Sequence, residues 1–177
     1  MMIFLKKYKS AAAVLGLSFL VVSCNANRNP FEVTVTRCPA VAIMGYAGEL
    51  TMFDGVGRDR QDVAYSALMS NLRTTCNQGS DVQGQVSFLV SATRGPAATA
   101  DTITVPYFVA VIRDNNLVVA KKIYDVTLTF RGDSLRAQTM ETISNYIPEI
   151  ERARTYDYEL LVGFQLSDNE VVYNLLK

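Results

Sequence analysis

The sequence predicts an all-β protein, an immunoglobulin/fibronectin-III-like antiparallel β-sandwich of about seven to nine strands that follows an N-terminal signal helix. Apolar and polar residues alternate with a period of two in several segments. Turn-forming residues recur roughly every 8–12 residues between these segments. The chain has 177 residues, of which 49% are hydrophobic, so it is long enough for one domain with a core.

The first strands are expected soon after residue 30. Apolar and polar side chains alternate over residues 31–36, which is typical of a half-buried strand. Residues 41–53 hold one or two further strands with a bend or bulge at Gly45 and Gly48, and residues 54–57 form a turn.

Residues 58–76 fit either a helix or a strand. Their Ala, Leu and Met residues favour a helix, and Val63, Ala67 and Leu72 could share one helical face. The same segment also alternates as a strand would, and the surrounding pattern is β. We therefore predict a strand over residues 59–76.

The second half of the chain carries stronger strand signals and ends in a tail. Pro148 begins one or two expected helical turns over residues 148–154, and a turn at 167–169 leads into a C-terminal tail, residues 168–177. Asp114-Asn115-Asn116 is a hairpin turn. Strands are expected at residues 85–92, 105–113, 117–123, 126–130, 135–146 and 158–166, the last of them central in its sheet.

Residues 1–25 have the three parts of a lipoprotein signal. Three lysines precede an apolar run at residues 11–22, which is shorter than the roughly 20 residues of a membrane-spanning helix. Val21-Val22-Ser23 then leads into Cys24. This stretch resembles the lipobox of bacterial lipoproteins, which implies diacylation of the Cys24 thiol, cleavage before Cys24 and acylation of the new N-terminus. A plain secretory signal and a membrane-spanning helix are the alternatives.

The signal defines the expected domain boundaries and location. Removing residues 1–23 leaves a lipidated tether, residues 24–30, with a reach of about 15–20 Å, and a sandwich domain, residues 31–167. Residue 25 is Asn, whereas retention at the inner membrane usually needs Asp there. By resemblance to enterobacterial sorting, we expect anchoring to the cell outer membrane, facing the periplasm. A lipoprotein that faces outward is an open alternative.

Two cysteines remain after the lipidated one. Cys38 and Cys76 form an even pair in an oxidising compartment, so we predict a disulfide that closes a loop of about 38 residues. Two unpaired thiols are the alternative. Two cysteines in a chain without histidine are too few to ligate zinc.

Five segments of the mature chain carry packing and turn motifs. They are Cys38–Ala42, Asn71–Cys76, Pro106–Val109, Arg136–Thr139 and Leu161–Leu166. These segments resemble those of an uncharacterised alphaproteobacterial lipoprotein family of β-sandwich type. The resemblance covers nearly the whole mature chain, supports a strand that ends at Cys76, and implies no activity.

Few residues point to catalysis. The lack of histidine excludes Ser-His-Asp and Cys-His catalysis. Asp157 and Glu159 share one face of a strand and could serve a glycosidase, but such a pair is more typical of a solvated face. Gly55-Val56-Gly57 and Arg131-Gly132-Asp133 resemble a phosphate loop and an integrin-binding tripeptide, yet each lies where a turn is expected.

Aromatic residues in the second half are candidates for an interface, since tyrosine offers a large contact area with a polar tip. The alternative is that a sandwich core takes up these rings. They are Tyr107, Phe108, Tyr124, Tyr146, Tyr156 and Tyr158.

These features favour a non-enzymatic, lipid-anchored binding or assembly module. Its expected contacts are the membrane, through the acyl chains on Cys24, and an envelope protein or polymer bound by a sheet edge or loops. We expect no cofactor and no metal. Nucleic acid is not expected as a partner, because Lys plus Arg equals Asp plus Glu at 17 each. The alternative function is a carboxylate-based periplasmic glycan hydrolase.

Overall fold

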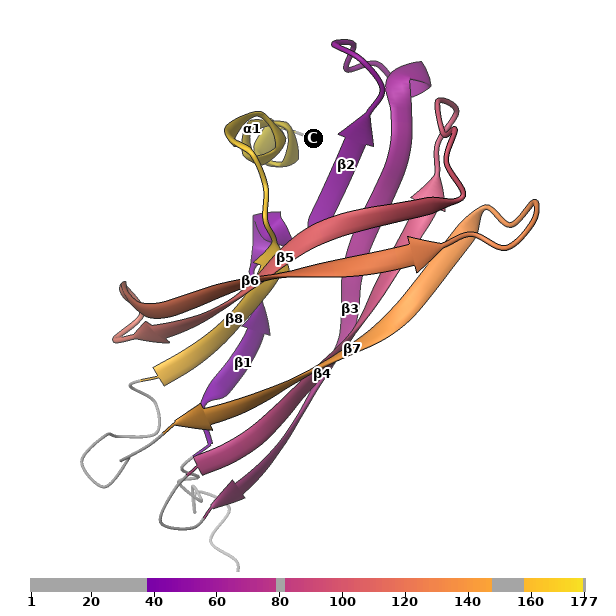
Figure 1. Cartoon of the computed structure of the whole chain (residues 1–177). Coiled ribbons are helices and arrows are strands. Elements are labelled where there is room, and N and C mark those ends of the chain that lie inside the picture. Colours follow the sequence, from indigo (N-terminus) through magenta and orange to yellow (C-terminus); the bar gives the residue numbers. More distant parts are fainter. Residues whose placement is uncertain (1–37, 79–81, 148–157, 177) are drawn as a thin grey trace, which may run out of the picture. The chain divides into compact units, whose positions relative to one another are not determined.

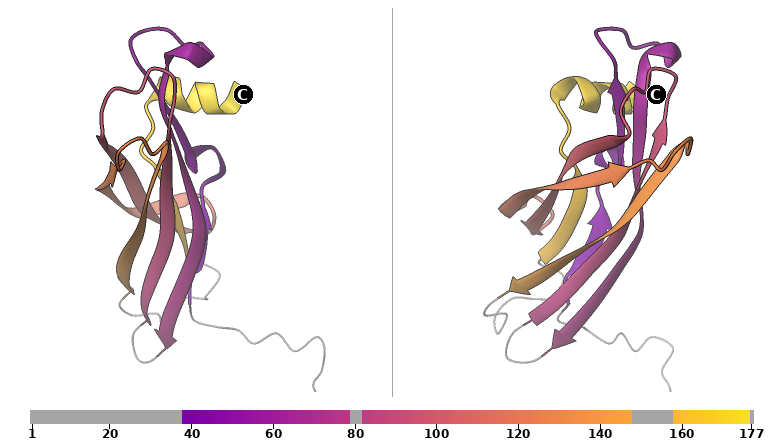
Figure 2. Two further views of the ribbon diagram at one scale, coloured as in Figure 1. Left: turned by 90° about the vertical axis from the view of Figure 1, so that its right-hand side faces the viewer. Right: turned by 45° about the vertical axis from the view of Figure 1, so that its right-hand side comes forward.

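The computed structural model describes residues 38–78, 82–147 and 158–176, which form a β-sandwich of two packed four-stranded sheets (Figures 1 and 2). The first sheet has the strand order β1 (Ala40–Ile43), β8 (Tyr158–Phe164), β5 (Thr102–Arg113), β6 (Leu117–Thr129). The second sheet has the order β2 (Glu49–Phe53), β3 (Val63–Gln78), β4 (Val82–Arg94), β7 (Arg136–Ile147). The predicted all-β sandwich of seven to nine strands is confirmed at this level.

One strand pair departs from the antiparallel expectation. β1 pairs with β8 in parallel, with Ala40 beside Glu159 and Ile43 beside Val162, whereas the other strand pairs are antiparallel. The reason is the path of the chain, which enters at the edge of the first sheet and then crosses to the second. A short 3₁₀ helix, η1 (Gly45–Ala47), makes this crossing at the bend that the glycines predicted.

The core lies between the sheets and is filled by alternate residues of the central strands. This is the period of two that the sequence showed, with every second side chain directed inward. Fully or almost fully buried side chains include Val86, Phe88 and Val90 of β4, Val105 and Tyr107 of β5, and Leu160, Val162 and Phe164 of β8. Burial of each of these side chains contributes on the order of 1.5–3 kcal/mol.

The ambiguous segment before Cys76 is a strand, as predicted. β3 follows a second 3₁₀ helix, η2 (Arg60–Asp62), and pairs with both β2 and β4. Ala67 and Met69 are buried while Leu68 is 45% exposed, so the segment alternates as a strand between two faces. Its helix-forming residues are overridden by the pairing on both sides.

The β5–β6 hairpin contains the predicted turn. Asp114 and Asn115 have φ values of 53° and 57°, a left-handed conformation that Asp and Asn tolerate well. Two separate strands, 117–123 and 126–130, were expected after the turn. The structure has one strand instead, because Tyr124 and Asp125 pair without a break with Tyr107 and Pro106.

The tail predicted from residue 168 contains a helix, α1 (Asp168–Leu176), which lies beside β2 (Figure 1). Glu170 stabilises its first turn, since its Oε2 atom accepts hydrogen bonds from the Ser167 backbone N–H at 2.7 Å and from Ser167 Oγ at 2.8 Å. The Asn174 side-chain amide donates to the backbone oxygens of Tyr46 and Glu49 at 2.8 and 2.7 Å. These contacts hold α1 against the edge of the second sheet.

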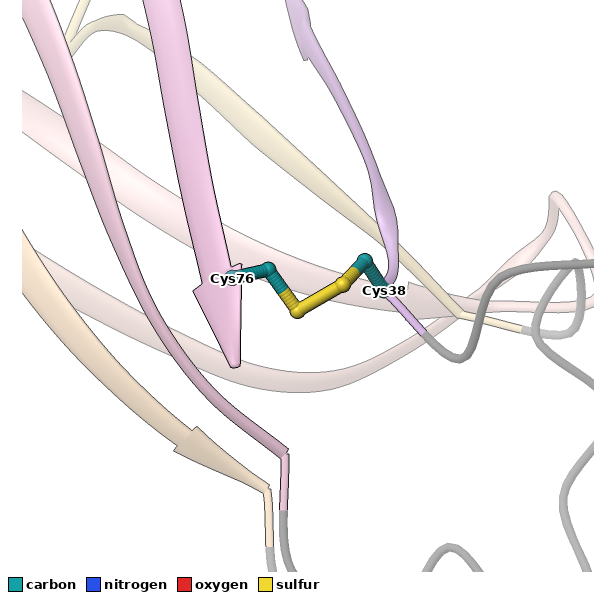
Figure 3. The surroundings of a disulfide bond; sticks show 2 residues. All are labelled: Cys38 and Cys76. Carbon is teal, nitrogen blue, oxygen red and sulfur yellow. A yellow bond between two sulfur atoms is a disulfide. The ribbon is translucent and has the colours of Figure 1, made fainter. Parts of the chain in front are cut away.

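The predicted disulfide is present. Cys38 and Cys76 are bonded, with their Cα atoms 6.0 Å apart (Figure 3). Cys38 precedes β1 and Cys76 lies near the end of β3, so the bond connects the two sheets at one end of the sandwich.

Several predictions fall outside the described residues. They concern the signal and tether (1–30), the strand at 31–36, most of the turn at 78–80, and the helical turns at 148–154. In the part of the chain that the structure describes, no helix combines the length and hydropathy needed to cross a membrane.

Candidate functional site

The four sheet edges differ in how they are covered. β1 is only four residues long. β2 is covered by α1, whose Tyr173 ring packs edge-on against Phe53 with centroids 5.1 Å apart. β7 presents mainly polar side chains outward, with Met140 as its one large apolar exception in residues 136–144. β6 is 13 residues long and pairs, within the described ranges, with β5 alone.

The first half of β6 is apolar and exposed. Leu117, Val118, Val119 and Ile123 each have 44–55% of their surface exposed. Soluble proteins rarely expose several large apolar side chains together on one strand, and a long apolar edge strand is a template for pairing with another strand. We call the unpaired side of Leu117–Thr129 the β6 edge.

The direction of the backbone groups on the β6 edge follows from the ladder with β5. The Phe130 N–H donates to the Asp101 carbonyl at 2.8 Å, and the register from there to Ala120 is continuous. Antiparallel residues alternate between bonding to one neighbour and to the other. Lys121, Ile123 and Asp125 therefore direct their N–H and C=O groups to the β6 edge.

A shallow apolar groove lies beside this edge on the outer face of the first sheet. It has a volume of about 230 Å³, and its lining includes Phe108, Ile112, Val118, Lys121, Leu161 and Val171. The Lys121 ammonium lies 4.5 Å from the centre of the Phe108 ring, which is a cation–π contact. Val118 and Lys121 of β6 line the groove, so the groove adjoins the exposed half of β6 and carries a positive charge.

The floor of the groove depends on a close approach at Gly163. A Cβ atom on this residue would lie 2.8 Å from the Cβ of Ala47 and 3.0 Å from the Phe108 ring. Only glycine lets η1 pack this closely on β8. This packing fixes the position of Phe108, and hence that of the Lys121 ammonium above it.

A polar cluster joins the two sheets on the inner side of β6. The Tyr107 hydroxyl donates to Glu141 Oε2 at 3.1 Å, and the Tyr124 ring stacks on Tyr107 with centroids 5.4 Å apart. The Lys122 ammonium lies 4.9 Å from the Tyr124 ring centre. Burial, followed by the charge of Glu141 and its hydrogen bond, raises the pKa of the Tyr107 hydroxyl. Tyr107 therefore keeps its proton and donates it in the hydrogen bond to Glu141, which is a structural role.

The carboxylate pair of the sequence analysis is described only in part. Asp157 lies outside the described residues. Glu159 is half-buried on β8, and with the Asn115 amide nitrogen turned toward it, that group donates to both carboxylate oxygens at 3.0 and 3.2 Å. Glu159 thus contacts the tip of the β5–β6 hairpin.

The two motif-like tripeptides lie in turns, as expected. Gly55 and Gly132 both have positive φ values, 76° and 54°. A Cβ on Gly57 would collide with the Asp62 carboxylate, so a negative charge lies directly against this loop and would repel a phosphate. The loop around Gly57 is therefore unsuited to phosphate.

The aromatic candidates are dispersed. Tyr107 is buried in the core, Phe108 underlies the groove, and Tyr124 and Tyr158 are half-buried. Tyr156 and the side chain of Tyr146 lie outside the described residues, as does Cys24. The sequence alone does not mark Leu117–Ile123 as a site. The sequence signal that could have found it is the run of four consecutive apolar residues, Leu117–Ala120, directly after the hairpin turn.

No family model, curated protein or solved structure matches this chain. Among the described residues, no group of three or more His, Cys, Asp or Glu side chains is arranged to hold a metal ion.

Proposed function

We propose that this chain is a lipid-anchored, non-enzymatic binding or assembly module of the bacterial envelope, and that it captures a protein partner by accepting a strand at the β6 edge. The lipobox ending at Cys24 supports the anchor, and Asn25 supports the periplasmic face of the outer membrane. The sandwich is proposed to be of immunoglobulin or fibronectin-III type, on its strand number and two layers.

The observation that carries the proposal is the β6 edge itself. Unpaired backbone groups on a long edge supply main-chain hydrogen bonds to an added strand, and alternate side chains supply specificity. Ile123 offers both, because its backbone faces the β6 edge and its side chain is 55% exposed. The adjoining groove adds apolar area on the same face.

The test uses proline substitution at two edges. Ile123→Pro removes an N–H that faces the β6 edge and leaves the ladder with β5 intact, so the domain should fold. Met140→Pro is the matched control. Met140 is 54% exposed on β7, and its N–H also faces away from the neighbouring strand, since the Arg94 N–H bonds to the Leu135 carbonyl in the same register.

Partners are captured by crosslinking in intact cells, followed by affinity purification of the lipidated chain from membranes. We expect crosslinked species with the wild type and with Met140→Pro, and their loss with Ile123→Pro. Circular dichroism and an intact Cys38–Cys76 bond verify folding of both variants. An unchanged set of crosslinked proteins in folded Ile123→Pro would contradict binding at the β6 edge.

A further inference from the structure

We propose that the partner at the β6 edge is a second copy of this chain, paired antiparallel about a twofold axis at Ile123. This inference rests on the proposed function, because it names the strand that the β6 edge accepts. The β1-β8-β5-β6 sheets of the two copies would then form one continuous sheet of eight strands. Three features of β6 support this pairing: the directions of its backbone groups, the positions of its charges and its exposed residues.

The backbone limits which registers are allowed. Two facing residues must both direct their N–H and C=O groups toward each other, or both away. On β6 the odd-numbered residues from Lys121 to Thr129 face the free edge, and the even-numbered ones face β5. The twofold axis must therefore lie where a residue faces the same residue of the other copy. A register in which two neighbouring residues, such as Ile123 and Tyr124, face each other across the axis is excluded.

The charges select one register among those allowed. With the axis at Ile123, Lys121 of each copy lies opposite Asp125 of the other, and the two Ile123 side chains lie opposite each other. Directly opposed side chains share a face, and opposite charges in such pairs stabilise a sheet by roughly 0.2–1 kcal/mol each. Lys121, Ile123 and Asp125 are all exposed, so nothing in the described residues covers these groups.

The neighbouring registers lack this match. An axis at Lys121 or at Lys122 places that lysine opposite the same lysine of the other copy, and this like-charge pair is destabilising. An axis at Tyr124 places Ile123 opposite Asp125 and leaves Lys121 without an opposed charge. An axis at Ala120 is centred on the irregularity in β6 where the pairing with β5 shifts register.

The inner face of the same register is also compatible. Lys122 of each copy lies opposite Tyr124 of the other. Its ammonium already lies 4.9 Å from the ring of its own Tyr124, so the lysine meets an aromatic face on both sides. Two copies anchored to one membrane also meet at a raised local concentration.

Cysteine crosslinking of the lipidated protein in membranes tests the register. Hydrogen-bonded antiparallel pairs have Cα atoms about 5.5 Å apart, which suits a disulfide. Ile123→Cys should therefore yield a covalent dimer on mild oxidation, reversed by reductant. Met140→Cys, equally exposed on the other sheet, is the control and should yield several-fold less dimer.

A charge swap in the Ile123→Cys background tests the pairing. Lys121→Asp turns two attractive pairs into repulsive ones, and we expect the dimer yield to fall about tenfold. Adding Asp125→Lys restores the pairs with reversed sign and should recover the yield. The contact of Lys121 with Phe108 is lost in both variants, so recovery reports on the intermolecular pair alone.

A dimer yield for Ile123→Cys no higher than for Met140→Cys would overturn the inference, as would failure of the double swap to recover it. If that happens while Ile123→Pro still loses a different crosslinked protein, the β6 edge binds that protein and the proposed function stands. If Ile123→Pro also changes nothing, both proposals fail.

Discussion

Breaking the Cys38–Cys76 disulfide should strongly destabilise the sandwich. The bond joins the start of β1 in the first sheet to the end of β3 in the second, so its loss frees one end of the two-layer structure. Cys38→Ser, Cys76→Ser and the double variant should have the same effect, because each removes one and the same crosslink.

The expected magnitude follows from the loop that the disulfide closes. The cysteines are 38 residues apart, and a loop of that size restricts the unfolded chain by about 4 kcal/mol at 25 °C on the chain-entropy model. A domain of this size has a total stability of roughly 5–15 kcal/mol. The variants should therefore retain the fold with a much smaller margin.

Urea unfolding followed by circular dichroism measures this change. Each variant should lose about 4 kcal/mol of unfolding free energy, and reductant should lower the wild type to the same value while leaving the variants unchanged. Thiol titration of the denatured, unreduced wild type should find neither Cys38 nor Cys76 reactive. Two reactive thiols, or single variants that differ from each other by several kcal/mol, would refute the reasoning.

Three further predictions concern the groove, the polar cluster and the anchor. Gly163→Ala should cost about 1–3 kcal/mol in urea unfolding because its Cβ overlaps two neighbours, whereas Gly45→Ala, with open space around it, should be nearly neutral. The raised pKa of Tyr107 keeps its proton on the folded chain after the unfolded chain has lost its own, near pH 10. Stability should thus fall as the pH rises above about 10, and Tyr107→Phe should flatten that fall in unfolding curves. Cys24→Ala should move the protein out of the membrane fraction or leave uncleaved precursor, as fractionation and immunoblotting would show.

Much of the fold could be predicted because the sandwich core imposes a local pattern. Val86, Phe88 and Val90 occupy alternate positions, and each is fully buried on one side of β4, whereas the residues between them, Ser87 and Leu89, point to the other side. The cysteine pair was likewise predicted from number and compartment. These features depend on short stretches of sequence and on elementary chemistry, so they do not require knowledge of the strand order.

The helix α1 was missed although its start carries a signal. Ser167 and Glu170 have the spacing of a capping box, and Glu170 does accept two hydrogen bonds from Ser167. The helix is nine residues long, too short to be stable from propensity alone. Its stability comes from distant contacts, such as that of Asn174 with the backbone at Tyr46, which no local pattern reveals.

The β6 edge could not be predicted for a related reason. An apolar run such as Leu117–Ala120 is also what a strand buried on both faces would show. Only the strand order, which is set by pairing between residues far apart in sequence, places this run at the outside of a sheet. The same apolar run would be buried in a central strand, but it is exposed in an edge strand.

The two lysines on β6 would make the proposed binding edge selective. Parallel, in-register stacking of many copies would place Lys121 next to Lys121 and Lys122 next to Lys122 at every layer, so that the repulsion grows with each added chain. The twofold register at Ile123 avoids every like-charge pair and gives Lys121 an opposed Asp125. In the proposed pairing, the same side chains therefore oppose open-ended aggregation and favour one closed pair.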